Sequence, residues 1–201
     1  MLLTLLLILT APPPAAAVSD LTSLSKHVQS IRTLQANMVQ RKEIIVLGEA
    51  IETQGTFAFA RPRRLVIDLE GAGGITLIID GDQMTTHYQA LGRTDRVRLS
   101  ADTRAAAVAE HLFLLLEGDP AAMNRSYDLE ETGTEPFRLR LTPRSAALRR
   151  VIAHVDTTFD PRGFVTEIVL SEANGDRTTW TFTDVRLNAE IPAGRFRLAN
   201  P

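Results

Sequence analysis

Short runs of alternating apolar and polar residues, separated by turn signals, recur along most of the chain and constrain its fold most strongly. Such runs are typical of strands with one buried face. Asp80-Gly81 and Asn174-Gly175 are hairpin signals between neighbouring runs. The pattern therefore predicts an antiparallel sheet, closed or half closed into a barrel. The expected strands are residues 38–47, 51–60, 64–69, 75–79, 83–88, 94–99, 127–131, 137–142, 151–159, 165–171, 178–187 and 195–199.

Two segments change to the period of a helix. Residues 21–34 place apolar side chains at three- and four-residue steps, and Asp20 can cap their start. Residues 102–117 are rich in alanine and leucine, with Asp102 able to cap the helix and Gly118 able to end it. This second helix is apolar nearly all round, so it must be buried or must cover something apolar.

The stretch 55–69, GTFAFARPRRLVIDL, combines an apolar row with a charge. Phe57 and Phe59 point to one face of the expected strand, and Arg61 continues that row. A guanidinium there is costly unless it finds hydrogen-bond partners. Pro62 lacks an amide donor and breaks the strand. The window alone also fits an exposed loop arginine beside a turn proline.

The N-terminal segment reads as an export signal. Residues 1–10 are nearly all apolar but too few to span a membrane, and prolines follow them. Ala15 and Ala17 fit the small-x-small cleavage rule, so we expect a signal peptide over residues 1–17 and one mature domain over residues 18–201. No lysine or arginine precedes the leucines, and an uncleaved buried helix is the alternative.

The composition excludes several kinds of site. The net charge is −2 with no basic stripe, which argues against nucleic-acid binding. The chain has no cysteine, so disulfides, thiolate nucleophiles and cysteine-held metals are excluded. The four histidines lack ligand spacing, and no phosphate-binding or hydrolase motif is present. Trp180 is expected to share a strand face with Phe182 and Asp184, where core packing explains it as well as a ligand does. We therefore expect a binding protein with no catalytic residue, metal or cofactor.

The order and spacing of many short segments resemble the LolA-type outer-membrane lipoprotein carriers, over nearly the whole mature chain. The matching segments are a helix after the signal peptide, Gly55-x-Phe57-x-Phe59-x-Arg61-Pro62, Ile78-Ile79-Asp80-Gly81, an apolar helix ending Leu116-Glu117-Gly118-Asp119-Pro120, Tyr127, Leu141-Thr142-Pro143-Arg144, Asp160-x-x-Gly163, Asn174-Gly175-Asp176, Phe182-x-Asp184-Val185-x-x-Asn188, Ile191-Pro192 and Phe196.

The resemblance implies a fold of mainly β structure with helices (α+β), an unclosed half-barrel with an apolar cavity under a helical lid. Arg61 would correspond to the arginine that holds this lid closed, and Leu65 to the residue at the cavity mouth. The cavity would be lined by Phe57, Phe59, Leu65 and Ile67, and the lid helix would contribute Val108, Leu112, Phe113, Leu115 and Leu116.

The resemblance also implies a function and partners. The chain would be a monomer of the periplasm that carries acylated lipoproteins. An inner-membrane lipoprotein-releasing transporter would load it, and an outer-membrane acceptor would unload it. Three alternatives stay open: a carrier of another lipid or glycolipid, a sensing module on the same fold that signals through a protein partner, and a hydrolase that uses the scattered His and Asp residues.

Overall fold

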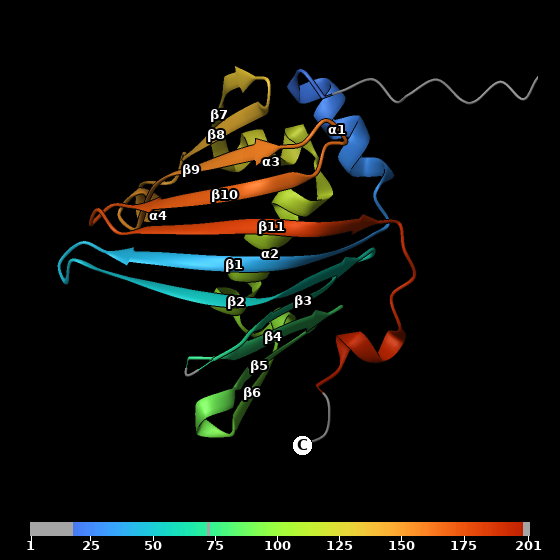
Figure 1. The fold of residues 1–201 in the computed structure, drawn as a ribbon, viewed down its shortest axis with the longest axis vertical. Helices are drawn as coiled ribbons and strands as arrows, with labels where there is room; N and C mark the ends of the chain where they lie inside the picture. Colours follow the sequence, from blue (N-terminus) through green and yellow to red (C-terminus); the bar gives the residue numbers. More distant parts are fainter. Residues whose placement is uncertain (1–17, 72, 199–201) are drawn as a thin grey trace, which may run out of the picture.

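The protein is built on one 11-stranded antiparallel sheet (Figure 1). The computed structural model describes residues 18–71 and 73–198, without the side chain of Leu115, and the expected signal peptide lies outside this part. The strand order is β6-β5-β4-β3-β2-β1-β11-β10-β9-β8-β7, so the edges are β6 and β7 and the sheet is open. The strands are β1 Thr33–Ile44, β2 Glu49–Ala60, β3 Arg64–Leu69, β4 Ile75–Asp80, β5 Gln83–Tyr88, β6 Arg93–Arg98, β7 Tyr127–Thr134, β8 Phe137–Pro143, β9 Ile152–Phe159, β10 Val165–Glu172 and β11 Arg177–Leu187.

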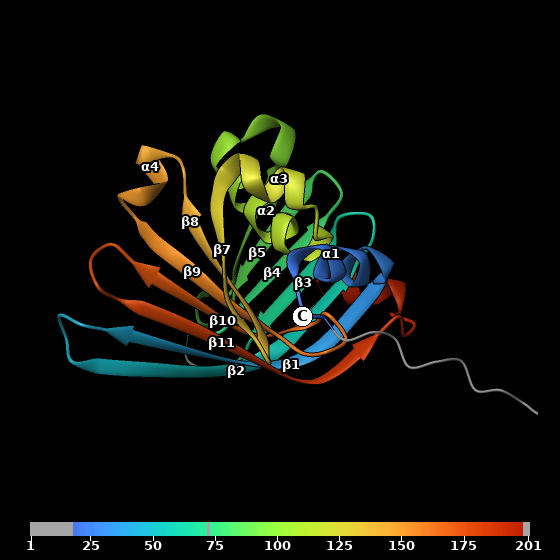
Figure 2. The same cartoon turned by 90° about the horizontal axis from the view of Figure 1, so that it is seen from above.

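Three helices form a cover over the concave side of the curved sheet. They are α1 Leu21–Ser30, α2 Thr103–Glu117 and α3 Pro120–Ser126, as Figure 2 shows. The short α4 Ala146–Arg149 joins β8 to β9, and the 3-10 turns are η1 Gln89–Leu91, η2 Leu99–Ala101 and η3 Ala193–Phe196. The predicted fold class, an unclosed antiparallel sheet covered by helices, is confirmed.

Local signals set most helix ends. Asp20 caps α1 by accepting a hydrogen bond from the backbone N–H of Ser23 at 2.8 Å. Asp102 accepts from two backbone N–H groups at the start of α2, and Gly118 ends that helix in the left-handed conformation with φ of +63°. Both capping predictions are confirmed, because each uses a side chain or a glycine within a few residues of the helix end.

The first helix is shorter than predicted. It ends at Ser30, and Ile31 already has extended backbone. Leu34 lies in β1 and pairs with Phe59 on one side and Leu187 on the other. Leu34 fits both the helical period and the two-residue period of Leu34, Ala36 and Met38. Strand pairing on both sides decided between them.

Two further segments differ from the prediction. Residues 195–199 were expected as a strand, but η3 occupies Ala193–Phe196, because Phe196 turns inward and is buried on the convex face of the sheet. No helix was expected between Gly118 and the strand at residue 127, but α3 forms there, with Asp119 as its cap and Pro120 in its first turn.

A bulge changes which residues of β11 face the interior. The pairing of β1 with β11 shifts between Gln35 and Asn37, and Asp184 has φ of +52°. Asp184 turns outward and accepts a hydrogen bond from the Asn37 amide at 2.7 Å, whereas Val185 packs on the core. The expectation that Asp184 shares a face with Trp180 and Phe182 is therefore wrong.

Candidate functional site

An apolar interior lies between the concave face of the sheet and α2. Phe57 and Phe59 of β2 stand directly opposite Ile67 and Leu65 of β3, so all four predicted cavity residues share one face. They belong to one cluster, hereafter the interior, with residues from β1, β4, β5 and β11. Leu65 was expected at a cavity mouth, but it is 0% exposed and lies inside. Strands on both sides and α2 above bury this position.

The helix α2 covers this interior with one face. Phe113 is 1% exposed and its ring lies 6.4 Å from that of Phe59, centroid to centroid. Leu112 and Leu116 pack partly buried against the same cluster. Val108 is 50% exposed and turns away from the interior, because a helix exposes one side even when its sequence is apolar all round. The side chain of Leu115 lies outside the described part of the chain.

Sequence reasoning missed Ala109 as a site residue. It is 0% exposed and lies one turn before Phe113 on the inner face of α2. A small residue there lets the helix backbone approach the sheet closely. The four-residue step from Ala109 to Phe113 was a usable signal, but it was hidden among the many alanines of this helix.

Arg61 bonds the ends of two helices of the cover. Its Nε donates to the carbonyl oxygen of Ile31 at 2.8 Å, and its Nη2 donates to those of Val28 and Glu117, each at 3.3 Å. These carbonyls lie at the C-terminal ends of α1 and α2, where backbone oxygens lack helical partners and carry partial negative charge. Its guanidinium also lies 5.8 Å from the centre of the Phe59 ring. One cation therefore joins both helix ends to the sheet.

The two helix ends also contact each other directly. The Ser25 hydroxyl of α1 donates to the carbonyl oxygen of Gly118 at 2.9 Å. A Cβ on Gly118 would lie 2.5 Å from Cγ1 of Val28. The close approach of α1 to the end of α2 therefore requires a glycine for space as well as for its positive φ.

Arg63 is a second arginine of the same turn that contacts the cover. Its Nη2 donates to Oε1 of Glu110 on α2 at 2.6 Å, and its guanidinium lies 4.8 Å above the centre of the Phe113 ring. Arg63 has φ of +57°, which is uncommon for a residue with a Cβ. Sequence reasoning missed this contact, because its partners come from a distant segment.

The interior is filled by the protein's own side chains. Phe59, Leu65, Ile79 and Phe113 are each at most 1% exposed. An open groove of about 530 Å³ is lined mostly by polar side chains, including Asn37, Asp184 and Arg195, although Phe57 and Val185 of the interior cluster also border it. Because polar groups predominate there, the groove does not suit an acyl chain. A guest in the apolar interior requires the cover to move.

Titratable groups form no metal-binding cluster in residues 18–71 and 73–198. No three His, Asp or Glu side chains gather there as metal ligands would. Burial raises the pKa of Tyr127, whose ring makes an edge-to-face contact with that of His111 at 5.9 Å between centroids. Across the same residues, none of the helices has the length and apolar character needed to cross a bilayer.

Comparison with known proteins gives consistent matches. Residues 29–199 match the family model described as outer membrane lipoprotein carrier protein LolA. An outer-membrane lipoprotein carrier protein of Pseudomonas fluorescens is 26% identical over 90% of this chain and 85% of its own length. One from Halorhodospira halophila is 28% identical, over 92% and 84% respectively. In fold, a chain of the Pseudomonas aeruginosa MucA/MucB complex superposes with a TM-score of 0.51 at 14% identity, over 90% of this chain and 60% of its own.

Proposed function

The chain belongs to the LolA family of outer membrane lipoprotein carrier proteins, and on that premise we propose that it carries lipoproteins across the periplasm. It takes their acyl chains into the interior at the inner membrane and delivers them to the outer membrane. The helical cover acts as a lid over this interior. No catalytic step is needed, because binding and release are both non-covalent.

The observation that carries this proposal is the position of Arg61. It lies at the edge of a fully apolar interior and bonds the ends of both helices that close it. Hydrogen bonds to a charged group contribute about 1.5–3 kcal/mol each. These bonds can form and break as a set, which gives the lid two states without any change to the sheet.

Acyl chains need an apolar site during transfer, because their exposure to water costs free energy. Each CH₂ kept from water contributes about 0.8 kcal/mol, so a sixteen-carbon chain approaches roughly 12 kcal/mol as an upper bound. A carrier must also release its guest. A lid that closes over its own side chains competes with cargo and lowers the net affinity by the free energy of closing. The sequence has no nucleotide-binding motif, so loading must draw its energy from a membrane partner.

Transfer between membranes tests this function. The mature chain is incubated with inner-membrane vesicles that hold a tagged lipoprotein and its releasing transporter, and then with outer-membrane vesicles. We expect lipoprotein to appear in the soluble fraction as a complex with the chain and then to move to the second membrane. Mass spectrometry of the complex should find acyl-chain lipid. A complex with another lipid and no lipoprotein would instead support the alternative cargo.

The variant Arg61→Leu tests the lid. The substitution removes charged hydrogen bonds that favour the closed lid. Loss of even one of them is expected to slow release to the acceptor about tenfold or more. The measurement is the rate at which lipoprotein leaves the soluble complex. Arg96→Leu, at an exposed position on β6, is the matched control and should release at the normal rate. Normal release from Arg61→Leu would remove Arg61 from the mechanism.

A further inference from the structure

The tip of the β1–β2 hairpin exposes three consecutive apolar side chains. Ile45, Val46 and Leu47, hereafter the tip, are 63%, 88% and 61% exposed, and Ile51 on the returning strand is 54% exposed. In Figures 1 and 2 this hairpin projects at the end of the sheet away from α1. A run of large apolar side chains on a protruding turn, rather than scattered singly, indicates a surface that meets something apolar.

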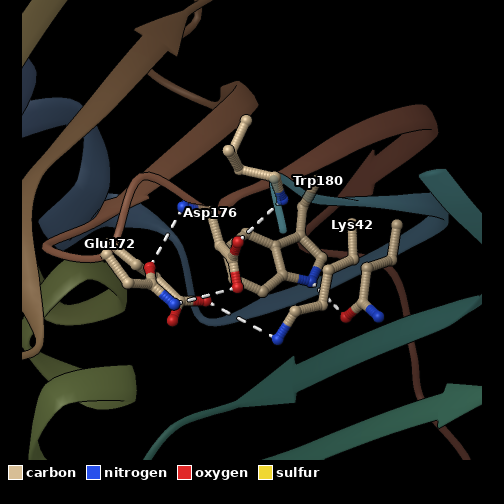
Figure 3. Close-up of polar contacts among 7 residues, drawn as sticks. Lys42, Glu172, Asp176 and Trp180 are labelled. Atoms are coloured by element: carbon tan, nitrogen blue, oxygen red, sulfur yellow. Dashed lines mark hydrogen bonds and ion pairs between the residues drawn. The ribbon is translucent and has the colours of Figure 1, made fainter. Parts of the chain in front are cut away.

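The tip has a defined shape. The backbone N–H of Leu47 donates to the carbonyl oxygen of Ile44 at 3.1 Å, and that of Gly48 donates to Ile45 at 3.2 Å. The Ile45 N–H donates to Oδ1 of Asp176 at 2.9 Å, which ties the tip to the β10–β11 turn (Figure 3). The tip is therefore held in position by its neighbours.

The tip lies at the end of the same concave sheet face that lines the interior. Ile51 has the same parity along β2 as Phe57, so both face the concave side. Between the tip and the interior lie Trp180, whose Nε1 donates to Gln40 at 2.8 Å, and the ion pair of Lys42 with Glu172 at 3.6 Å (Figure 3). These polar contacts separate the tip from the interior, so the tip is a surface distinct from the proposed cargo site.

Size and charge identify the occupant. Three side chains cover far less than the roughly 800 Å² per partner of a stable protein interface. The basic side chains near the tip are Arg41, Lys42 and Arg177, and the carboxylates of Glu43, Glu172 and Asp176 beside them leave no net positive charge. Nothing here favours an anionic surface. A zwitterionic lipid bilayer, by contrast, accepts a small apolar protrusion at its interface.

We propose that the tip inserts into the interface of zwitterionic lipid bilayers and docks the open end of the half-barrel on the membrane. One short apolar element gives weak, reversible attachment. Such attachment suits a chain that must leave each membrane after contact. This membrane contact goes beyond the carrier function, because it requires neither cargo nor a membrane partner.

The absence of cysteine makes a site-specific probe straightforward. Val46→Cys in the mature chain is labelled with an environment-sensitive fluorophore and mixed with phosphatidylcholine vesicles that carry no protein. We expect the emission to rise and shift to the blue, nitroxide-labelled lipid to quench it, and added salt to change it little. Leu91→Cys, at another exposed apolar position (69% exposed), is the matched control and should not respond.

A charge at the tip completes the test. Val46→Asp should lower the vesicle-bound fraction in flotation about tenfold, whereas Leu91→Asp should leave it unchanged. Because both side chains are exposed, thermal unfolding should be unaffected in either variant. No response at position 46, equal responses at both positions, or binding only to anionic vesicles would overturn the proposal. So would a signal that rises with protein concentration before vesicles are added, which would make a second copy the occupant.

Discussion

Arg61 and Arg63 lie in one turn beside apolar surface. Each offsets the desolvation cost of its guanidinium with different partners. Arg61 uses backbone carbonyls, whose partial charges come from helix ends. Arg63 uses an exposed carboxylate and the face of an aromatic ring. Only the first arrangement depends on both helices being in place. Under the proposed function, Arg61 would therefore respond to closure of the cover, whereas Arg63 holds α2 on the sheet.

We predict that the Phe113 ring contributes more to stability than the ion pair of Arg63 with Glu110. Glu110→Gln should change the free energy of unfolding by less than about 1 kcal/mol, because the Glu110 side chain is 64% exposed. Phe113→Ala should lower it by about 3–5 kcal/mol, because that ring is fully buried. Urea unfolding measures both. A larger loss in Glu110→Gln than in Phe113→Ala would contradict this order.

The elements that form the cover meet at their ends rather than along their lengths. Gly118 ends α2 where Val28 of α1 leaves no room for a side chain. Ser25 and Arg61 bond the carbonyls of the same junction. This junction therefore sets the position of both helices together, and a change there should affect both.

The variant Gly118→Ala tests this junction. We expect it to cost about 2–4 kcal/mol of unfolding free energy, from the left-handed backbone and from the clash with Val28. Gly81→Ala is the matched control. Its φ of +60° is similar and no atom lies within 4 Å of its Cβ position, so it should cost only about 1–2 kcal/mol. Adding Val28→Ala should recover part of the excess loss. Equal losses in the two glycine variants would argue against close helix contact.

In the whole molecule, both faces of one half of the sheet are covered. The helices cover the concave face, and the C-terminal segment covers part of the convex face, where Phe196 packs on Ala58, Ala60, Val66 and Ile78. The sheet supplies a fixed frame between these layers. Under the proposed function, motion of the helical cover would expose the interior while the convex packing keeps the strands in place.

The whole molecule should also lose stability in acid. The backbone N–H of Ser23 lowers the pKa of Asp20, and the hydroxyl of Ser100 lowers that of Asp82, both below the ordinary value of 3.8. Groups with lowered folded pKa stabilise the fold above their unfolded pKa and lose this contribution as pH falls through the folded pKa. The unfolding free energy should therefore fall between about pH 5 and pH 2.

The double variant Asp20→Asn and Asp82→Asn isolates this effect. Its unfolding free energy should fall less steeply over the same pH range, as measured by urea titration at each pH. Glu135→Gln, an exposed carboxylate at the end of a hairpin, is the matched control and should keep the original slope. An unchanged slope in the double variant would mean that other carboxylates account for the acid response.

The sequence by itself determined the features that depend on neighbouring residues. Alternation of apolar residues predicted a strand at each place from β1 to β11, although β1 begins at Thr33 rather than at the expected residue 38. Asp20, Asp102 and Gly118 marked helix ends through hydrogen bonds and backbone preferences that act within a few residues.

Tertiary structure decided the features that require contacts between distant segments. Leu34 and Phe196 fit more than one local pattern, and packing against the sheet settled the conformation of each. The turn of β11 at Asp184 depends on its pairing with β1. The acceptors of Arg61 come from the ends of two helices, 30 to 56 residues away along the chain. The spacing of residues along the chain does not predict such contacts, because they form only after the sheet has placed the helix ends over its edge.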